Sequence, residues 1–268
     1  MVQIHEQENI ISEYNDDENE NIRPPPTVAT FYSISNLQNG LSGVGLGEYL
    51  IKQVVKKLRQ EIPTLDTYVT LSPMPTFRKW LQACAISISH STIFQPPIFE
   101  RDGVEWVQKA DLEEIAKLLQ CEVNGALVKL IEKLDEERNQ SRIEDNSSVD
   151  ETRSRSQQSS SSTSISENLY DTKLVQRILT QLAAHYLIQE KHRRKPLDNV
   201  ARFHVSNGAE IYRINYGADL SRKGWLTSFG IMVNYRYNLN NLQMNQDQYE
   251  SDYALQIHEN VNSLLHSK

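Results

Sequence analysis

A strand, a glycine-rich turn, a helix and a second strand follow one another in the first third of the chain. The segment TVATFYSISN (27–36) mixes β-branched and aromatic residues without helical spacing, which predicts a buried strand. After the turn, GEYLIKQVVKKLRQEI (47–62) carries apolar residues at every fourth position, which predicts a helix with a basic outer face. DTYVTL (66–71) predicts the second strand. This order of elements is typical of an α/β fold.

Further elements continue this pattern along the rest of the chain. Helical periodicity predicts helices in TFRKWLQACAI (76–86), ADLEEIAKLLQ (110–120), NGALVKLIEKLDEE (124–137), LYDTKLVQRILTQLAAHYLIQEK (169–191) and DYALQIHENVNSLL (252–265). Strand patterns are found in AEIYRINY (209–216) and GIMVNYRY (230–237).

Two polar stretches interrupt the folded part. Residues 1–26 form an acidic segment that ends in three prolines, and we expect a disordered lead-in there. Residues 139–168 form a serine-rich, low-complexity insertion that cannot bury enough apolar surface to offset its ordering entropy. The two stretches explain the low mean hydropathy of -0.56. We expect a single folded domain over residues 27–268, with the insertion inside it.

Charge and residue usage exclude several classes of protein. A formal charge of -7 argues against a nucleic-acid partner, which would require a basic face. The only cysteines, Cys84 and Cys121, suit a reducing compartment and exclude both a disulfide framework and a cysteine-built metal site. No pair of histidines has metal-ligand spacing with nearby acids, so no metal is assigned. No apolar run is long enough to span a bilayer, and no membrane partner is expected.

Ser72 lies between the predicted strand at 66–71 and the predicted helix at 76–86. Pro73 and Pro75 hold the turn around it, in the string TLSPMPTFRKWL. Serine is a favoured N-cap and proline suits the first turn of a helix, so a capping role accounts for this residue without any chemistry. A hydroxyl held rigidly at a strand end is the alternative.

The glycine-rich turn NGLSGVGLG permits an anion site. Its backbone N–H groups, backed by the helix dipole, suit a phosphate or pyrophosphate, although glycines in such turns are also common for packing reasons. No Gly-Lys-Ser/Thr follows, so the turn is not a Walker loop. The residues concerned are Gly40, Leu41, Ser42, Gly43, Val44, Gly45 and Gly47.

Two further segments contain candidates for chemistry. His204, in VARFHVSNGAEIYRINY, is expected to be buried near a turn between strand-like segments, where an imidazole serves as base, acid or structural hydrogen-bond partner. Tyr235 and Tyr237 are predicted on one face of a strand, with Arg236 on the other. Tyrosines are ordinary strand formers, but a buried phenol also donates a hydrogen bond to a developing enolate.

Taken in order, four long motifs resemble the catalytic domain of malonyl-CoA decarboxylases. They are FYSISNLQNGLSGVGLGEYLIKQVVKKL, TLSPMPTFRKWL, HYLIQEKHRRKPLDNVARFHVSNGAEIYRINYGADLSRKG and GIMVNYRY. The resemblance implies a mixed sheet flanked by helices, of the acetyltransferase-like (GNAT-type) class and incomplete at its N-terminal side. It implies decarboxylation of malonyl-CoA to acetyl-CoA and CO2 in fatty-acid metabolism, without metal or organic cofactor.

The same resemblance assigns roles to the candidate residues. It implies Ser72, His204 and Tyr237 as catalytic residues and the glycine turn as the loop that holds the coenzyme A pyrophosphate. Ser72 paired with His204 would orient the malonyl carboxylate and relay the proton. The family carries an acid in this loop at the position of Gly45. The alternative is therefore a catalytically impaired module that binds coenzyme A esters.

The resemblance also bears on assembly and compartment. Members of the family are oligomeric, so a homo-oligomer is expected, and the compartment is the mitochondrial matrix, the peroxisome or the cytosol. The chain ends in Ser267-Lys268 without the final leucine of a peroxisomal signal.

Overall fold

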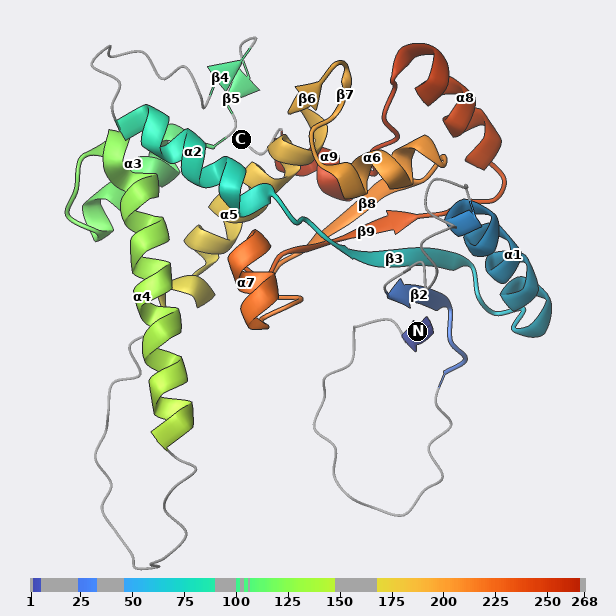
Figure 1. The fold of residues 1–268 in the computed structure, drawn as a ribbon, viewed down its shortest axis with the longest axis horizontal. Helices are drawn as coiled ribbons and strands as arrows, with labels where there is room; N and C mark the ends of the chain where they lie inside the picture. Colours follow the sequence, from blue (N-terminus) through green and yellow to red (C-terminus); the bar gives the residue numbers. More distant parts are fainter. Residues whose placement is uncertain are drawn as a thin grey trace, which may run out of the picture. The chain divides into compact units, whose positions relative to one another are not determined.

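The described part of the chain contains both strands and helices, with a run of helices between residues 109 and 188 (Figure 1). The computed structural model describes residues 2–5, 24–32, 46–89, 100–101, 104–105, 107–147 and 168–265. They form two compact units, Met1–Phe77 with Ala184–Ser267, and Arg78–Ala183. The chain passes between the units within α2 (Phe77–Ser89) and α5 (Lys173–Ile188).

The first unit contains a five-stranded mixed sheet. Its strand order is β1 (Val2–His5), β2 (Val28–Tyr32), β3 (Thr67–Pro73), β9 (Met232–Arg236) and β8 (Glu210–Asn215). Only the pair β2 and β3 among these is parallel, and α1 (Leu46–Glu61) lies between these two strands in the sequence, because parallel neighbours need a crossover connection. The prediction of a mixed sheet with flanking helices is confirmed. β1 lies inside the range predicted as a disordered lead-in, so Val2–His5 departs from that expectation.

β3 lies in the middle of this sheet. It pairs with β2 on one side and with β9 on the other, so its backbone is held along both edges. Val69, Thr70 and Ser72 are buried. Ser72 lies near the end of the strand and is paired with Val233 of β9. A hydroxyl at position 72 is therefore positioned by a central strand and not by a loop.

Helices of the first unit pack on the later strands. α6 (Asn199–Ser206) packs on β8 and on α8 (Leu242–Asp252), α7 (Arg222–Ser228) packs on β3, and α9 (Glu259–Leu265) packs on β8. A short hairpin, β6 (Lys191–His192) and β7 (Lys195–Pro196), precedes α6.

The predicted helix at 252–265 is only partly correct. Helical structure begins at Glu259, because the preceding residues pair with β8: Ile211 N–H donates to the Gln256 carbonyl at 2.9 Å, and His258 N–H donates to the Ile211 carbonyl at 2.9 Å.

The described residues of the second unit are mostly helical and include one short antiparallel strand pair. This unit contains most of α2 and α5, and its other elements are β4 (Glu100–Arg101), β5 (Val104–Glu105), α3 (Lys109–Leu118), η2 (Val123–Gly125), α4 (Ala126–Ser147) and η3 (Leu169–Asp171). The guanidinium of Arg177 binds both carboxylate oxygens of buried Asp111, at 2.8 and 2.6 Å. α4 extends into the range predicted as a low-complexity insertion, and residues 148–167 lie outside the described residues.

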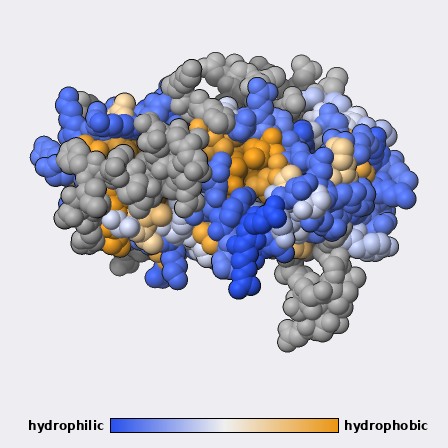
Figure 2. Space-filling view, turned by 90° about the horizontal axis from the view of Figure 1, so that it is seen from above, coloured by the Kyte–Doolittle hydropathy of each residue, from blue (hydrophilic) through white to orange (hydrophobic). Residues whose placement is uncertain are grey.

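The surface is mixed in character. Figure 2 shows apolar areas between hydrophilic residues on the face that it displays. Within the described ranges, no helix is both long and apolar enough to cross a membrane.

Candidate active site

Ser72, His204 and Tyr237 form one hydrogen-bonded chain in the first unit. Ser72 Oγ lies 3.0 Å from His204 Nε2, and His204 Nδ1 lies 2.8 Å from the Tyr237 hydroxyl. The exposed fractions of the three residues are 7%, 5% and 1%. The structure thus brings together the three residues that the resemblance implies, although they are separated by up to 165 positions in the sequence.

His204 lies on a helix, which corrects the expectation of a turn between strands. It is in the last turn of α6, and the N-cap of this helix is Asp198, whose Oδ1 accepts hydrogen bonds from Val200 N at 2.9 Å and Ala201 N at 2.8 Å. An aspartate immediately before a helix is a capping signal, and reading VARFHVS as strand-like overlooked it. The prediction that His204 is buried is confirmed.

Asp198 itself is buried and fully enclosed by protein. Its second oxygen, Oδ2, accepts a hydrogen bond from the Tyr186 hydroxyl at 3.2 Å, and that hydroxyl also contacts Thr76 Oγ1 at 2.6 Å. Burial raises the pKa of the Asp198 carboxyl, and its hydrogen bonds from Ala201 and Tyr186 oppose this shift. This network fixes the start of the helix that carries His204.

Aromatic rings enclose the imidazole. The ring of Tyr235 stacks on His204 with centroids 4.3 Å apart and an angle of 19° between the planes, while Tyr237 meets the imidazole edge-on at 6.0 Å. Burial lowers the pKa of His204 to about 3, because no nearby acid compensates for the lost hydration of the charged form. The imidazole is therefore neutral at physiological pH.

The serine and the histidine face a cavity of about 620 Å³. Its floor includes Ser72 and His204, and its walls come from the ends of β2 and β3 and from α6 and α7. On α6, Val200 and Phe203 line the space beside Asn199 and His204, and the lining also includes Lys223 of α7 and Asp219, which precedes that helix. A cavity of this size holds a small acyl group together with part of a larger carrier.

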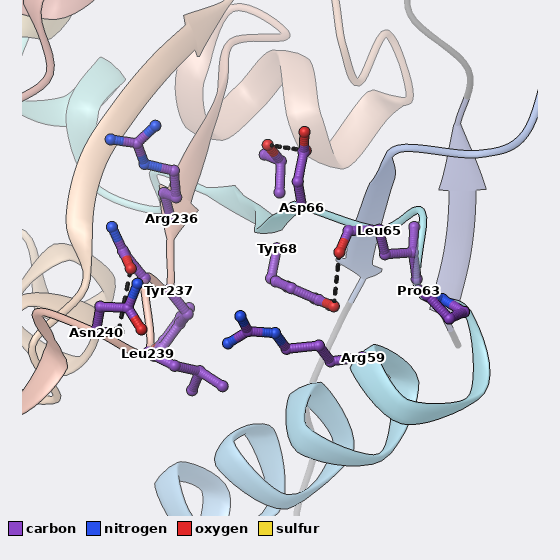
Figure 3. Close-up of a pocket in the computed structure, with 11 residues that line it drawn as sticks. Arg59, Pro63, Leu65, Asp66, Tyr68, Arg236, Tyr237, Leu239 and Asn240 are labelled. Atoms are coloured by element: carbon purple, nitrogen blue, oxygen red, sulfur yellow. Dashed lines mark hydrogen bonds between the residues drawn. The ribbon is translucent and has the colours of Figure 1, made fainter.

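A second cavity, of about 370 Å³, lies at the opposite end of β3 (Figure 3). It is lined by the end of α1, the start of β3 and the residues after Arg236 of β9, and its lining includes Tyr237 but neither Ser72 nor His204. Tyr68 on its wall donates a hydrogen bond to the Leu65 carbonyl at 3.1 Å. Because the serine and the imidazole are absent from it, this cavity is not the candidate reaction site.

Most of the predicted anion loop lies outside the described residues. These positions are Gly40, Leu41, Ser42, Gly43, Val44 and Gly45. Gly47 is described, and it lies in the first turn of α1, which begins at Leu46. The part of the chain that the structure describes contains no group of three or more His, Cys, Asp or Glu residues with metal-site geometry.

Two residues that support this site, Thr70 and Asp198, are not among the candidates from the sequence, and the stacking of the candidate Tyr235 on His204 was not predicted. Thr70 accepts a hydrogen bond from Ser72, Tyr235 stacks on His204, and Asp198 caps the helix that carries the histidine. The period of two along a strand places Thr70 on the same face as Ser72, which was an available signal. The stacking of Tyr235 on a helix residue follows only from the tertiary fold.

The low pKa of His204 predicts a pH dependence of stability. Its unfolded value is near 6.5 and its folded value near 3, so below pH 6.5 only the unfolded chain binds the proton. The contribution of the neutral His204 to the free energy of unfolding is fully present above pH 6.5. It is lost as the pH falls toward 3, and the total loss is roughly 3–5 kcal/mol. Urea unfolding at pH 7, 5.5 and 4.5 should therefore show that the free energy of unfolding declines less steeply with falling pH in His204→Asn than in the unchanged chain.

His192→Asn, which changes an exposed histidine, is the control for this prediction. An equally steep decline in His204→Asn would contradict a buried, neutral imidazole.

Comparison with known proteins identifies relatives of the whole chain. The family described as "Malonyl-CoA decarboxylase C-terminal domain" matches residues 4–268. Mitochondrial malonyl-CoA decarboxylase of Anser anser anser is 34% identical over 242 residues, which cover 89% of this chain and 40% of the goose protein. The Rattus norvegicus protein of the same name is 35% identical over 237 residues, 88% of this chain and 40% of its own length.

Solved structures agree with this result. Malonyl-CoA decarboxylase of Cupriavidus metallidurans has a TM-score of 0.60 at 31% identity, over 90% of this chain and 49% of that protein. Malonyl-CoA decarboxylase of Agrobacterium vitis has a TM-score of 0.58 at 31% identity, over 90% of this chain and 46% of that protein. The chain thus spans about 40% of the length of its curated relatives and a little under half of these crystallised chains.

Proposed function

Because the chain belongs to the malonyl-CoA decarboxylase family, we propose that it converts malonyl-CoA to acetyl-CoA and CO2. The observation that carries this proposal is the hydrogen-bonded chain of Ser72, His204 and Tyr237, whose serine and imidazole face a cavity large enough for the malonyl thioester. We also propose that the sheet and its helices represent an acetyltransferase-like fold, in which the turn before α1 holds the coenzyme A pyrophosphate.

The proposed reaction requires stabilisation of charge and delivery of one proton. The bond between the α-carbon and the carboxylate breaks, CO2 departs with both carboxylate oxygens, and the electron pair forms a thioester enolate. One proton added to the α-carbon then gives acetyl-CoA. Val200 and Phe203 contribute apolar surface to the cavity, and hydrogen-bond donors preorganised toward the developing oxyanion lower the barrier.

In this mechanism the Ser72 hydroxyl is the donor nearest to the reacting carbons. It lies at the end of a central strand, is nearly fully buried, and is backed by the imidazole of His204 at 3.0 Å. Ser72 delivers the proton to the carbon, and His204 returns one to the serine oxygen, with solvent as the final source. Tyr237 holds the orientation of the imidazole through the 2.8 Å contact to Nδ1.

A module that binds coenzyme A esters without turnover is the second candidate function. It is favoured by Gly45, which occupies the place where the family has an acid, and it predicts binding but no CO2. The relatives' names include the word mitochondrial, and we propose the mitochondrial matrix as the compartment, with peroxisome and cytosol as alternatives. A homo-oligomer is proposed as the assembly.

Calorimetry with malonyl-CoA, together with a CO2-release assay on the same preparation of the chain, separates these candidates. The proposal predicts binding with turnover. Binding without turnover would favour the module, and Gly45→Glu would then be the variant to assay for a gain of activity. Absence of binding by folded protein would contradict both functions.

A further inference from the structure

A buried hydroxyl, that of Thr70, contacts the candidate catalytic serine and lines the same cavity. Thr70 is 2% exposed and precedes Ser72 by two positions, so the two side chains project from the same face of β3. Ser72 Oγ donates a hydrogen bond to Thr70 Oγ1 at 3.0 Å. The backbone N–H of Tyr235, on neighbouring β9, donates to the same oxygen at 3.3 Å.

Two donors point at Thr70 Oγ1. The Tyr235 N–H occupies one lone pair of the threonine oxygen and the Ser72 hydroxyl, which is the donor in their contact, occupies the other, so the proton of Thr70 itself is directed to neither residue. Asn234 Nδ2 donates a hydrogen bond to the Thr70 carbonyl at 2.8 Å, which fixes the backbone at this position as well. Thr70 is thereby tied to β9 at two points and presents a fixed acceptor to the serine.

A serine hydroxyl has a single proton. Because that proton is directed to Thr70, the contact between Ser72 Oγ and His204 Nε2 must use a proton on the nitrogen. The imidazole is buried and neutral, so it carries only one N–H. Nδ1 is then an acceptor, and the Tyr237 hydroxyl donates to it.

We infer that Thr70 is a positioning residue that directs the Ser72 hydroxyl away from His204 and thereby holds the imidazole in the tautomer protonated at Nε2. All hydrogen bonds of the chain then run in one direction, from Tyr237 to His204 to Ser72 to Thr70. In this resting state the imidazole does not act as base toward the serine, so Ser72 is not activated as a nucleophile. Ser72 and His204 are instead arranged to donate a proton, and the carbanion of the proposed decarboxylation requires one. This consequence alone rests on the proposed function.

The tautomer is measurable without any enzymatic assay. Long-range ¹H–¹⁵N spectra of the full chain labelled with ¹⁵N-histidine distinguish a protonated from an unprotonated ring nitrogen, and the His204 signals are identified by their loss in His204→Asn. The unchanged chain should show the proton on Nε2. In Thr70→Val the serine proton turns to the imidazole, so the proton on His204 should move to Nδ1.

Matched variants separate this effect from a change in packing. Thr70→Ser keeps the acceptor and should keep the proton on Nε2. Thr30→Val changes another buried threonine of the same sheet, on β2, and should also leave the tautomer unchanged. The kcat for CO2 release should fall about five- to tenfold in Thr70→Val and recover in Thr70→Ser.

Two results would overturn the inference: a proton on Nδ1 in the unchanged chain, or a proton that stays on Nε2 in Thr70→Val. If Thr70→Val does not fold, Thr70→Ala supplies the same loss of acceptor with less steric change, and the unchanged chain alone still decides the tautomer. A chain that releases no CO2 but shows the expected tautomers would contradict the proposed function and leave the role of Thr70 intact.

Discussion

Replacement of His204 by asparagine should lower kcat for CO2 release from malonyl-CoA by roughly 10²- to 10⁴-fold, the usual contribution of a positioned acid or base. The imidazole contacts Ser72 at 3.0 Å and Tyr237 at 2.8 Å, so it joins the serine to the tyrosine. An asparagine amide still donates a hydrogen bond but cannot pass a proton from one ring nitrogen to the other. The loss should therefore fall on kcat, and KM should change little.

The control for this experiment is His192→Asn, which alters an exposed histidine of the β6–β7 hairpin. It should retain the kcat of the unchanged chain. Steady-state kinetics of the two variants decide the point: a His204→Asn protein that is folded and has kcat within a factor of three of the unchanged chain would remove the imidazole from the mechanism.

Asp198→Ala should destabilise the first unit by about 2–4 kcal/mol. The carboxylate is fully buried and accepts three hydrogen bonds, from Val200 N, Ala201 N and the Tyr186 hydroxyl. Loss of an N-cap costs about 0.5–2 kcal/mol, and donors left buried without acceptors add roughly 1–3 kcal/mol. Tyr186 retains Thr76 as a partner, which moderates the second effect.

A second N-cap offers a comparison at a more exposed place. Ser221 caps α7 by accepting a hydrogen bond from Gly224 N at 3.1 Å, and Ser221→Ala should cost about 1 kcal/mol. Urea unfolding of both variants measures the difference. Asp198→Asn, which keeps an acceptor oxygen toward the helix, should recover part of the loss; equal destabilisation by the two alanine variants would contradict a special role of the buried cap.

Local sequence patterns predicted most of the secondary structure and little of the arrangement around His204. The strands at β2, β3, β8 and β9 were each recognisable from β-branched and aromatic runs. β3 pairs with β9 across about 160 positions, and nothing in either segment specifies that partner. The contact between Thr70 and the Tyr235 N–H depends on this pairing and could therefore not be predicted from local sequence.

The candidate residues themselves came from motif resemblance and not from pattern. Ser72 looked like a helix cap, and His204 looked like a residue near a turn, because short segments such as VARFHVS satisfy strand and helix preferences about equally. In the structure a buried aspartate begins the helix, and an aromatic ring lies against the imidazole. Only the second feature is tertiary, since Tyr235 is distant from His204 in the sequence, whereas Asp198 caps backbone groups two and three positions further along the chain.

The most direct test of the account is release of CO2 from malonyl-CoA by the purified chain, measured side by side with Ser72→Ala. The account predicts steady formation of acetyl-CoA and CO2 in equal amounts by the unchanged chain, and a loss of at least a hundredfold in Ser72→Ala with malonyl-CoA binding retained. Equal rates for the two proteins, or no CO2 from a folded chain that binds the substrate, would contradict it.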